Sequence, residues 1–162
     1  HFLDKGKCIE DFAAQDWIFT YPKVIDVQVE AGDLVQKENL EGLSLAEHTD
    51  MIIFRTNFEK FRNQKIFWQE NPGLAPELAE YLTDKCPHLR GVGMDFISIS
   101  SFRHRAEGRK AHYEFLKRGV LLFEDMKLSE LPENGLLEKV IALPLRFENA
   151  DGAPVTILGE VG

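Results

Sequence analysis

The sequence contains very little cysteine. Cys8 and Cys86 are the two cysteines among its 162 residues, and they stand far apart with no CxxC spacing. That pattern does not indicate a disulfide framework or a structural zinc site, and it favours a reducing compartment. Each thiol is expected to be a small buried apolar residue rather than a nucleophile. We therefore predict a cytoplasmic protein.

An excess of positive charge is also lacking, as is any long apolar run. The formal net charge is −8, whereas a nucleic-acid binder needs a basic face. An acidic balance equally disfavours binding to anionic lipid. No apolar run reaches the roughly 18 to 20 residues of a membrane span, and no signal-peptide pattern opens the chain. We expect neither a nucleic-acid partner nor a membrane.

Repeats, low-complexity tracts and convincing linkers are absent as well. The chain is 44% apolar and 28% charged, which fits one globular domain with a sizeable core. No P-loop, dinucleotide fingerprint or GxSxG motif is present. We predict a single domain over residues 1–162. Because the chain begins at His1 rather than Met, we expect it to be a piece or a processed form of a longer protein.

Strand and helix patterns are mixed along the chain. Alternating or continuous apolar segments predict strands, and a 3.6-residue period predicts helices. A glycine or proline closes each helical pattern. The predicted fold class is α/β, with a mixed or barrel-like sheet of about six strands and flanking helices. The predicted strands cover residues 24–30, 50–56, 89–98, 120–123, 139–147 and 154–161, and the predicted helices cover 75–86 and 106–118.

One helix–glycine–strand unit, "AHYEFLKRGVLLFEDM" (111–126), carries two candidate ligands. The helix advances roughly 10 Å from His112 to Gly119, at about 1.5 Å per residue. The strand then covers roughly 16 Å from Gly119 to Glu124, at about 3.3 Å per residue. If the chain reverses at Gly119, Glu124 returns near His112, and the two form half of a plausible divalent metal site. On spacing alone, a helix histidine and a solvated strand-end carboxylate remain the favoured alternative.

A second candidate region is the serine cluster that follows Asp95. Ser98, Ser100 and Ser101 come at the predicted carboxyl end of a strand, where active-site residues often lie. The alternative, which we favour, is a serine-rich turn in which Asp95 caps backbone groups.

Seven patches of the chain, in order, resemble the putative cyclase family, whose best-understood members are bacterial metal-dependent kynurenine formamidases. "HFLDKG" resembles the end of the opening motif HxGTHxDxPxHF, "VIDV" an early strand, and "IIFRT" the LLRT segment. "NPGLAPELAEYL" resembles HPGLSxEAAxWL, and "GVGMDFISI" is similar to GIDxxSxD. "AHYEFLKRGVLLFEDMKLSELP" resembles AHxxLLxxGIxIxENLxNLxxLP, and "ALPLRFENADGAPV" resembles LPLKxxGxDGSPVR.

The resemblance implies a cyclase-like fold around a centre of one or two divalent ions, zinc or manganese. It makes His112 and Glu124 metal ligands, and it places His1 where the family has a histidine that acts as general base and acid. The implied reaction is hydrolysis of an amide, or of a cyclic amide or ester, in a small-molecule substrate, assisted by a metal that polarises the carbonyl and acidifies water. It also implies a homodimer or homotetramer.

The sequence departs from the family pattern at the site itself. The HxGTHxD segment would lie just before His1, and catalytic metal sites normally use at least three protein ligands. We therefore expect the chain as given to be inactive without upstream ligands. The alternative is a shortened, non-catalytic relative that binds a ligand or forms oligomers. Further departures leave the substrate open: Asn57-Phe58 replaces a glycine–tryptophan step, Ser100 an aspartate and Thr156 an arginine.

Overall fold

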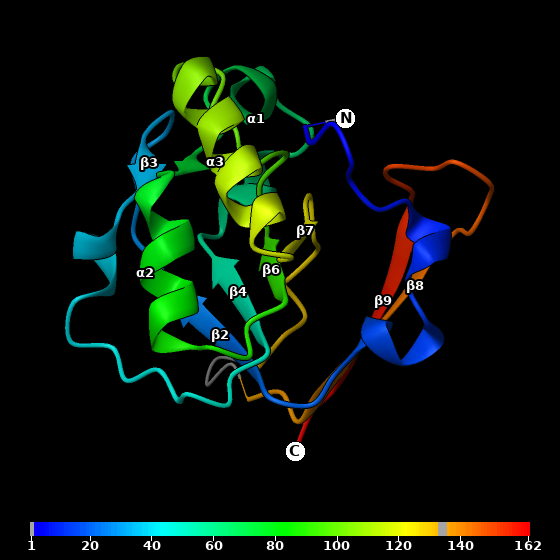
Figure 1. The fold of residues 1–162 in the computed structure, drawn as a ribbon. Coiled ribbons are helices and arrows are strands. Elements are labelled where there is room, and N and C mark those ends of the chain that lie inside the picture. The colour runs from blue at the N-terminus through cyan, green and yellow to red at the C-terminus, as the bar shows by residue number, and fades with distance from the viewer. Residues whose placement is uncertain (1, 133–135) are drawn as a thin grey trace.

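A four-stranded parallel sheet forms the centre of the molecule (Figure 1). The computed structural model describes residues 2–132 and 136–162. All five residues of β4 are buried, as expected for a parallel strand covered on both faces. The strands, in spatial order, are β2 (Pro22–Asp26), β4 (Met51–Arg55), β6 (Gly91–Met94) and β7 (Leu121–Phe123).

Two helices, α2 (Glu77–Lys85) and α3 (Arg105–Lys117), cover one face of this sheet (Figure 1). Helix α2 buries Leu78 and Leu82, and α3 buries Ala111 and Phe115. Each pair is four residues apart and so lies on one helix face. The short helix α1 (Lys65–Gln69) lies at the edge of this layer.

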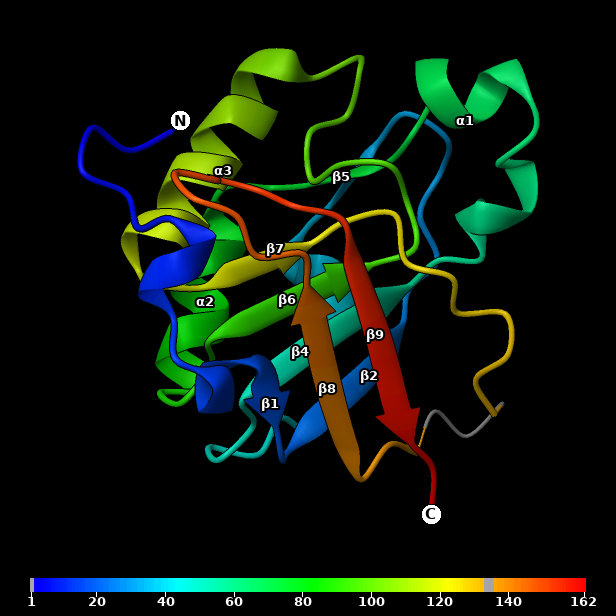
Figure 2. The ribbon, with the colours of Figure 1, turned by 90° about the vertical axis from the view of Figure 1, so that its right-hand side faces the viewer.

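A second sheet covers the opposite face of the parallel sheet (Figure 2). It is antiparallel, in the order β1–β8–β9, with β1 at Ile18–Phe19, β8 at Lys139–Pro144 and β9 at Val155–Glu160. A further parallel pair joins β3 (Leu34–Val35) to β5 (Gly73–Leu74). Four 3-10 helices occur in the described residues: η1 (Ile9–Asp11), η2 (Ala14–Trp17), η3 (Lys37–Leu40) and η4 (Phe58–Phe61).

The parallel sheet separates two hydrophobic cores. Ile52 and Phe54 of β4 pack with the helices, whereas Met51 and Ile53 pack with the antiparallel sheet, because successive strand residues point to opposite faces. Gly93 of β6 leaves space on the second face, since a Cβ there would lie 2.5 Å from the sulfur of Met126.

The predicted α/β class is confirmed, although the strands do not form one continuous sheet of about six. The strands divide into a four-stranded parallel sheet and a three-stranded antiparallel sheet, which face each other, and the separate pair of β3 and β5. The strand predicted over residues 24–30 ends at Asp26, because its last partner is Arg55 and β4 stops there. Within the described residues, no helix is long and apolar enough to cross a membrane.

Candidate functional site

The structure brings His112 and Glu124 together as the helix–strand unit predicts. His112 lies in α3, and Glu124 directly follows β7. The chain reverses between them at Gly119, which has a φ of 77°, a conformation that glycine adopts readily. His112 Nε2 lies 3.4 Å from Glu124 Oε1. This exceeds the usual N–H···O distance of about 2.7–3.2 Å, so the two groups face each other without a tight hydrogen bond.

The imidazole of His112 is held on its other side. Its Nδ1 lies 2.9 Å from the carbonyl oxygen of Gly108, one turn earlier in α3. A carbonyl only accepts, so we assign a proton to Nδ1, and Nε2 faces Glu124. The Ser100 hydroxyl lies 3.2 Å from the same Nδ1. Phe2 stacks on the ring, with centroids 4.1 Å apart and planes 11° from parallel.

The carboxylate of Glu124 is anchored through one oxygen. Oε1 accepts from the Ser98 hydroxyl at 2.9 Å and from the Ile99 N–H at 2.8 Å. No hydrogen bond from the described part of the chain reaches Oε2. Burial, the largest single influence, raises the pKa of Glu124, but His112, the Ile99 N–H and the Ser98 hydroxyl together hold this pKa below its ordinary value.

The serine turn therefore has a role that the favoured sequence interpretation missed. Ser98 and Ser100 each contact one member of the His112–Glu124 pair. Asp95 does cap backbone, as expected, because its carboxylate accepts from the N–H of Thr56 at 3.0 Å. The available sequence signal was the position of the serines at the carboxyl end of a parallel strand.

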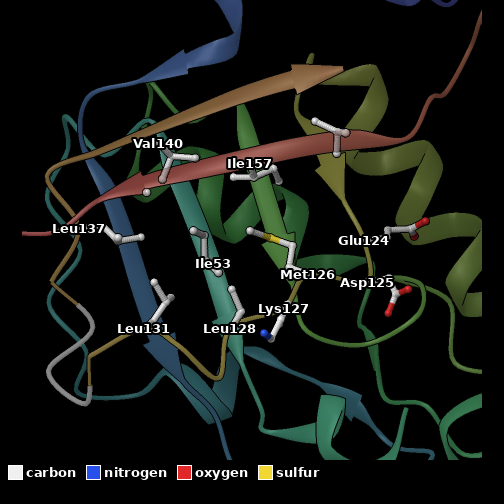
Figure 3. A pocket seen from close by; sticks show the side chains of 12 residues that line it. Ile53, Glu124, Asp125, Met126, Lys127, Leu128, Leu131, Leu137, Val140 and Ile157 are labelled. Carbon is white, nitrogen blue, oxygen red and sulfur yellow. The ribbon is translucent and has the colours of Figure 1, made fainter. Parts of the chain in front are cut away.

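Two cavities adjoin Glu124. One, of about 230 Å³, is lined by Glu124 and His112 together with Phe2, Trp17 and Asp151. The other, of about 280 Å³, lies between the two sheets and is mostly apolar. Figure 3 shows its lining side chains, with Glu124 and Asp125 at one end. Glu124 is thus placed where a polar group could meet a small molecule entering from either side.

The two side chains fit part of a divalent metal site. An imidazole nitrogen and a carboxylate oxygen are donors that zinc and related ions accept. The Gly108 carbonyl orients the imidazole, and the Ser98 and Ile99 donors orient the carboxylate, as groups around metal ligands commonly do. Among residues 2–132 and 136–162, no group of three or more His, Cys, Asp or Glu side chains is placed to hold an ion. A complete centre therefore needs ligands from elsewhere. His1 lies outside the described residues, so its role stays a prediction.

The profile described as "Putative cyclase" matches residues 1–101, more than half of the chain. The chain belongs to the putative cyclase family. Among its curated relatives, kynurenine formamidases of Bacillus cereus and Bacillus anthracis are each 28% identical to it over 156 residues. Each alignment covers 96% of this chain and 68% of the relative.

Two solved structures of isatin hydrolases share the fold of this family member. Isatin hydrolase A from Labrenzia aggregata, bound to benzyl benzoate, gives a TM-score of 0.73 at 18% identity. An isatin hydrolase bound to the product analogue thioisatinate gives 0.71 at 20% identity. The alignments cover 96% and 91% of this chain, but only 66% and 61% of those chains. These likenesses show the fold alone.

Proposed function

We propose that this chain is part of an amide-bond hydrolase that acts on a small molecule with the help of a divalent metal ion, zinc or manganese. His112 and Glu124 are the proposed metal ligands in this chain. The observation that carries the proposal is the approach of their side chains, at 3.4 Å, with each one oriented by a separate set of hydrogen-bonding groups. The names of the curated relatives and of the structural neighbours support the class of reaction.

Residues of this chain would bind the metal ion and orient the two side chains that hold it. His112 would offer Nε2 to a cation, while the Gly108 carbonyl fixes the ring through Nδ1. Glu124 offers Oε2 while Ser98 and Ile99 hold Oε1. A bound divalent ion would supply Lewis acidity toward the amide carbonyl and would lower the pKa of water at the site. The remaining ligands would come from residues preceding His1, where the family pattern has HxGTHxD, and His1 would act as the general base and acid.

Metal binding provides the first test, in the natural polypeptide that carries this sequence together with any residues that precede His1. Calorimetric titration with Zn²⁺ or Mn²⁺ should show one or two sites. His112→Ala and Glu124→Gln should each weaken binding by about a hundredfold or more, because loss of a ligand should exceed the roughly 10–100-fold effect of losing a group that only orients one. His88→Ala and Glu47→Gln, at exposed positions, are the matched controls.

Hydrolysis provides the second test. A formylated kynurenine and isatin, compounds to which the relatives' names point, should be assayed with the metal-loaded polypeptide and again after chelation. We expect turnover that chelation abolishes and that neither His112→Ala nor Glu124→Gln retains. Absence of bound metal in the natural polypeptide, combined with full activity of both variants, would overturn the proposal.

The assembly of the protein is proposed from the family resemblance. A homodimer or homotetramer in the cytoplasm is expected, and light scattering on the purified polypeptide would test the assembly. A monomer at micromolar concentration would contradict it.

A further inference from the structure

One loop contacts both members of the His112–Glu124 pair. This loop, residues 98–102, follows β6. It gives Glu124 the Ser98 hydroxyl and the Ile99 N–H, and it gives His112 the Ser100 hydroxyl. Within the loop, the Ser100 N–H donates to the Ser98 hydroxyl at 3.2 Å. A displacement of this loop would therefore move the partners of both side chains at once.

Asn71 anchors the loop from a distant part of the sequence. Its side-chain amide donates to the carbonyl oxygens of Ser100 at 2.8 Å and Ser98 at 3.3 Å. Its own oxygen lies 3.3 Å from the N–H of Phe102, which donates to it. Asn71 is 2% exposed, and a buried amide of this kind is costly unless its partners stay in place.

The loop also fits between two glycines. A Cβ at Gly73, close to Asn71 in the chain, would lie 2.6 Å from the Ser101 nitrogen and 2.7 Å from the Ile99 oxygen. A Cβ at Gly108 would lie 2.5 Å from the Cα of Ser100. Gly108 is also the residue whose carbonyl holds His112. Asn71 thus forms hydrogen bonds to a loop that is already packed closely on both sides. The Ser98 and Ser100 hydroxyls and the Ile99 N–H are therefore held in place.

We propose that Asn71 is a positioning residue, which aligns His112 and Glu124 by fixing the 98–102 loop. This inference rests on the proposed function, in which the two side chains bind a metal ion. Apart from one hydrogen bond to the carbonyl of the adjacent Pro72, at 2.9 Å, the hydrogen bonds of the Asn71 amide go to the loop, so its influence on the pair passes through the loop backbone. Its amide nitrogen is the group that matters, because it satisfies two loop carbonyls together.

The main test is Zn²⁺ affinity in the natural polypeptide, measured by calorimetry on the Asn71→Asp variant. A carboxylate has nearly the same shape but would present an oxygen to the carbonyls of Ser98 and Ser100. We expect binding to weaken about 10–100-fold, the range found when groups that orient metal ligands are lost. Asn39→Asp is the matched control, since the Asn39 side chain is exposed. The carboxylate of the substituted aspartate could still accept the hydrogen bond that the Gln36 N–H donates to Asn39 Oδ1. Equal affinity of a folded Asn71→Asp variant and this control would overturn the proposal.

A double-mutant cycle separates positioning from general stability. Ser98→Ala removes the hydroxyl that holds Glu124, and Asn71 acts through the same loop. The combined loss of Zn²⁺ affinity should therefore be smaller than the product of the two single losses. Independent, multiplicative losses would contradict the shared route. If Asn71→Asp does not fold, Asn71→Ala replaces it in the cycle, because it removes the amide without adding charge.

A measurement without metal keeps this inference distinct from the proposed function. The ¹⁵N resonances of the His112 ring report which nitrogen carries the proton and how it is hydrogen-bonded. They should change in Asn71→Asp and stay constant in Asn39→Asp. If wild type binds no Zn²⁺, the proposed function fails, and unchanged ring resonances in Asn71→Asp would separately overturn the positioning role.

Discussion

Gly108 and Ser100 approach so closely that no side-chain carbon fits between them. A Cβ at position 108 would lie 2.5 Å from the Cα of Ser100. The carbonyl of Gly108 is also hydrogen-bonded to His112. Helix α3, the 98–102 loop and the candidate metal ligand His112 therefore meet at this point.

Gly108→Ala should destabilise the protein, against the ordinary preference of helices. Within a helix, alanine is favoured over glycine by about 1 kcal/mol. Here the added methyl group should force Ser100 away, and overpacking of this kind typically costs about 1–3 kcal/mol. We expect a lower urea midpoint with an unchanged slope. Arg109→Ala, at the exposed neighbouring position, should change stability by less than about 0.5 kcal/mol. A more stable Gly108→Ala variant would show that the loop moves freely.

Asp125 adopts a left-handed conformation directly after Glu124, with a φ of 58°. Its carboxylate lies 2.6 Å from Nη1 of Arg62. Asp125→Ala and Asp125→Gly both remove that ion pair, but only alanine keeps the steric cost of the left-handed region. We expect the glycine variant to be more stable than the alanine variant by about 1 kcal/mol. Chemical unfolding of the two variants measures the difference, and equal stabilities would mean that the backbone relaxes at this position.

Asp95 should make a contribution to the free energy of unfolding that decreases as the pH rises. Burial raises the pKa of Asp95, although hydrogen bonds from Thr56 oppose it. The folded state then holds the proton more tightly than the unfolded chain does. The stability from this group is fully present below its unfolded pKa near 3.8 and is lost as the pH rises through the folded value.

The Asp95→Asn variant isolates this effect. The free energy of unfolding of wild type, minus that of the variant, should decrease as the pH rises from about 3 to 7. Urea titrations over a pH series measure it. A difference that increases with pH would mean that the Thr56 hydrogen bonds outweigh burial.

The two cysteines should differ in reactivity. Cys86 is fully buried, and burial raises the pKa of its thiol; Cys8 is partly exposed. The thiolate is the reactive form of cysteine. A thiol reagent should therefore label Cys8 quickly in the native protein and Cys86 only after unfolding. The Cys8→Ser variant should show no fast phase. Rapid labelling of Cys86 would indicate local opening of the core near α2.

Local patterns predicted the part of the site that is local in sequence. The helix, the glycine and the strand that connect His112 to Glu124 lie within 111–126, so periodicity and the glycine signal indicated that the two side chains could meet. Spacing alone nevertheless favoured an unrelated helix histidine and a solvated carboxylate, and the family resemblance reversed that preference. The division into two sheets was not predictable in the same way. A strand pattern does not say which strand is the partner, and β1, a two-residue strand with no recognisable pattern, joins the β8–β9 pair through Ile18 and Ile141.

The groups that orient the pair were hidden for a similar reason. Asn71 occurs in a turn signal, Asn-Pro-Gly, and nothing in that signal indicates an amide buried against Ser98 and Ser100, 27 and 29 residues later. Such hydrogen bonds arise only when β5 and the end of β6 come together in the fold. Sequence periodicity describes which face of an element is buried, but it does not identify the partner of a polar group.

Successive side chains of β4 face opposite cores, and this alternation has a consequence for how the protein unfolds. Ile53 and Phe54 are consecutive, yet each belongs to a different core. Loosening the antiparallel sheet exposes one side of β4, and loosening the helices exposes the other, so neither layer can detach without weakening the strand on which both depend. Heat or denaturant should therefore produce a single all-or-none transition, with tryptophan fluorescence and far-UV circular dichroism changing together.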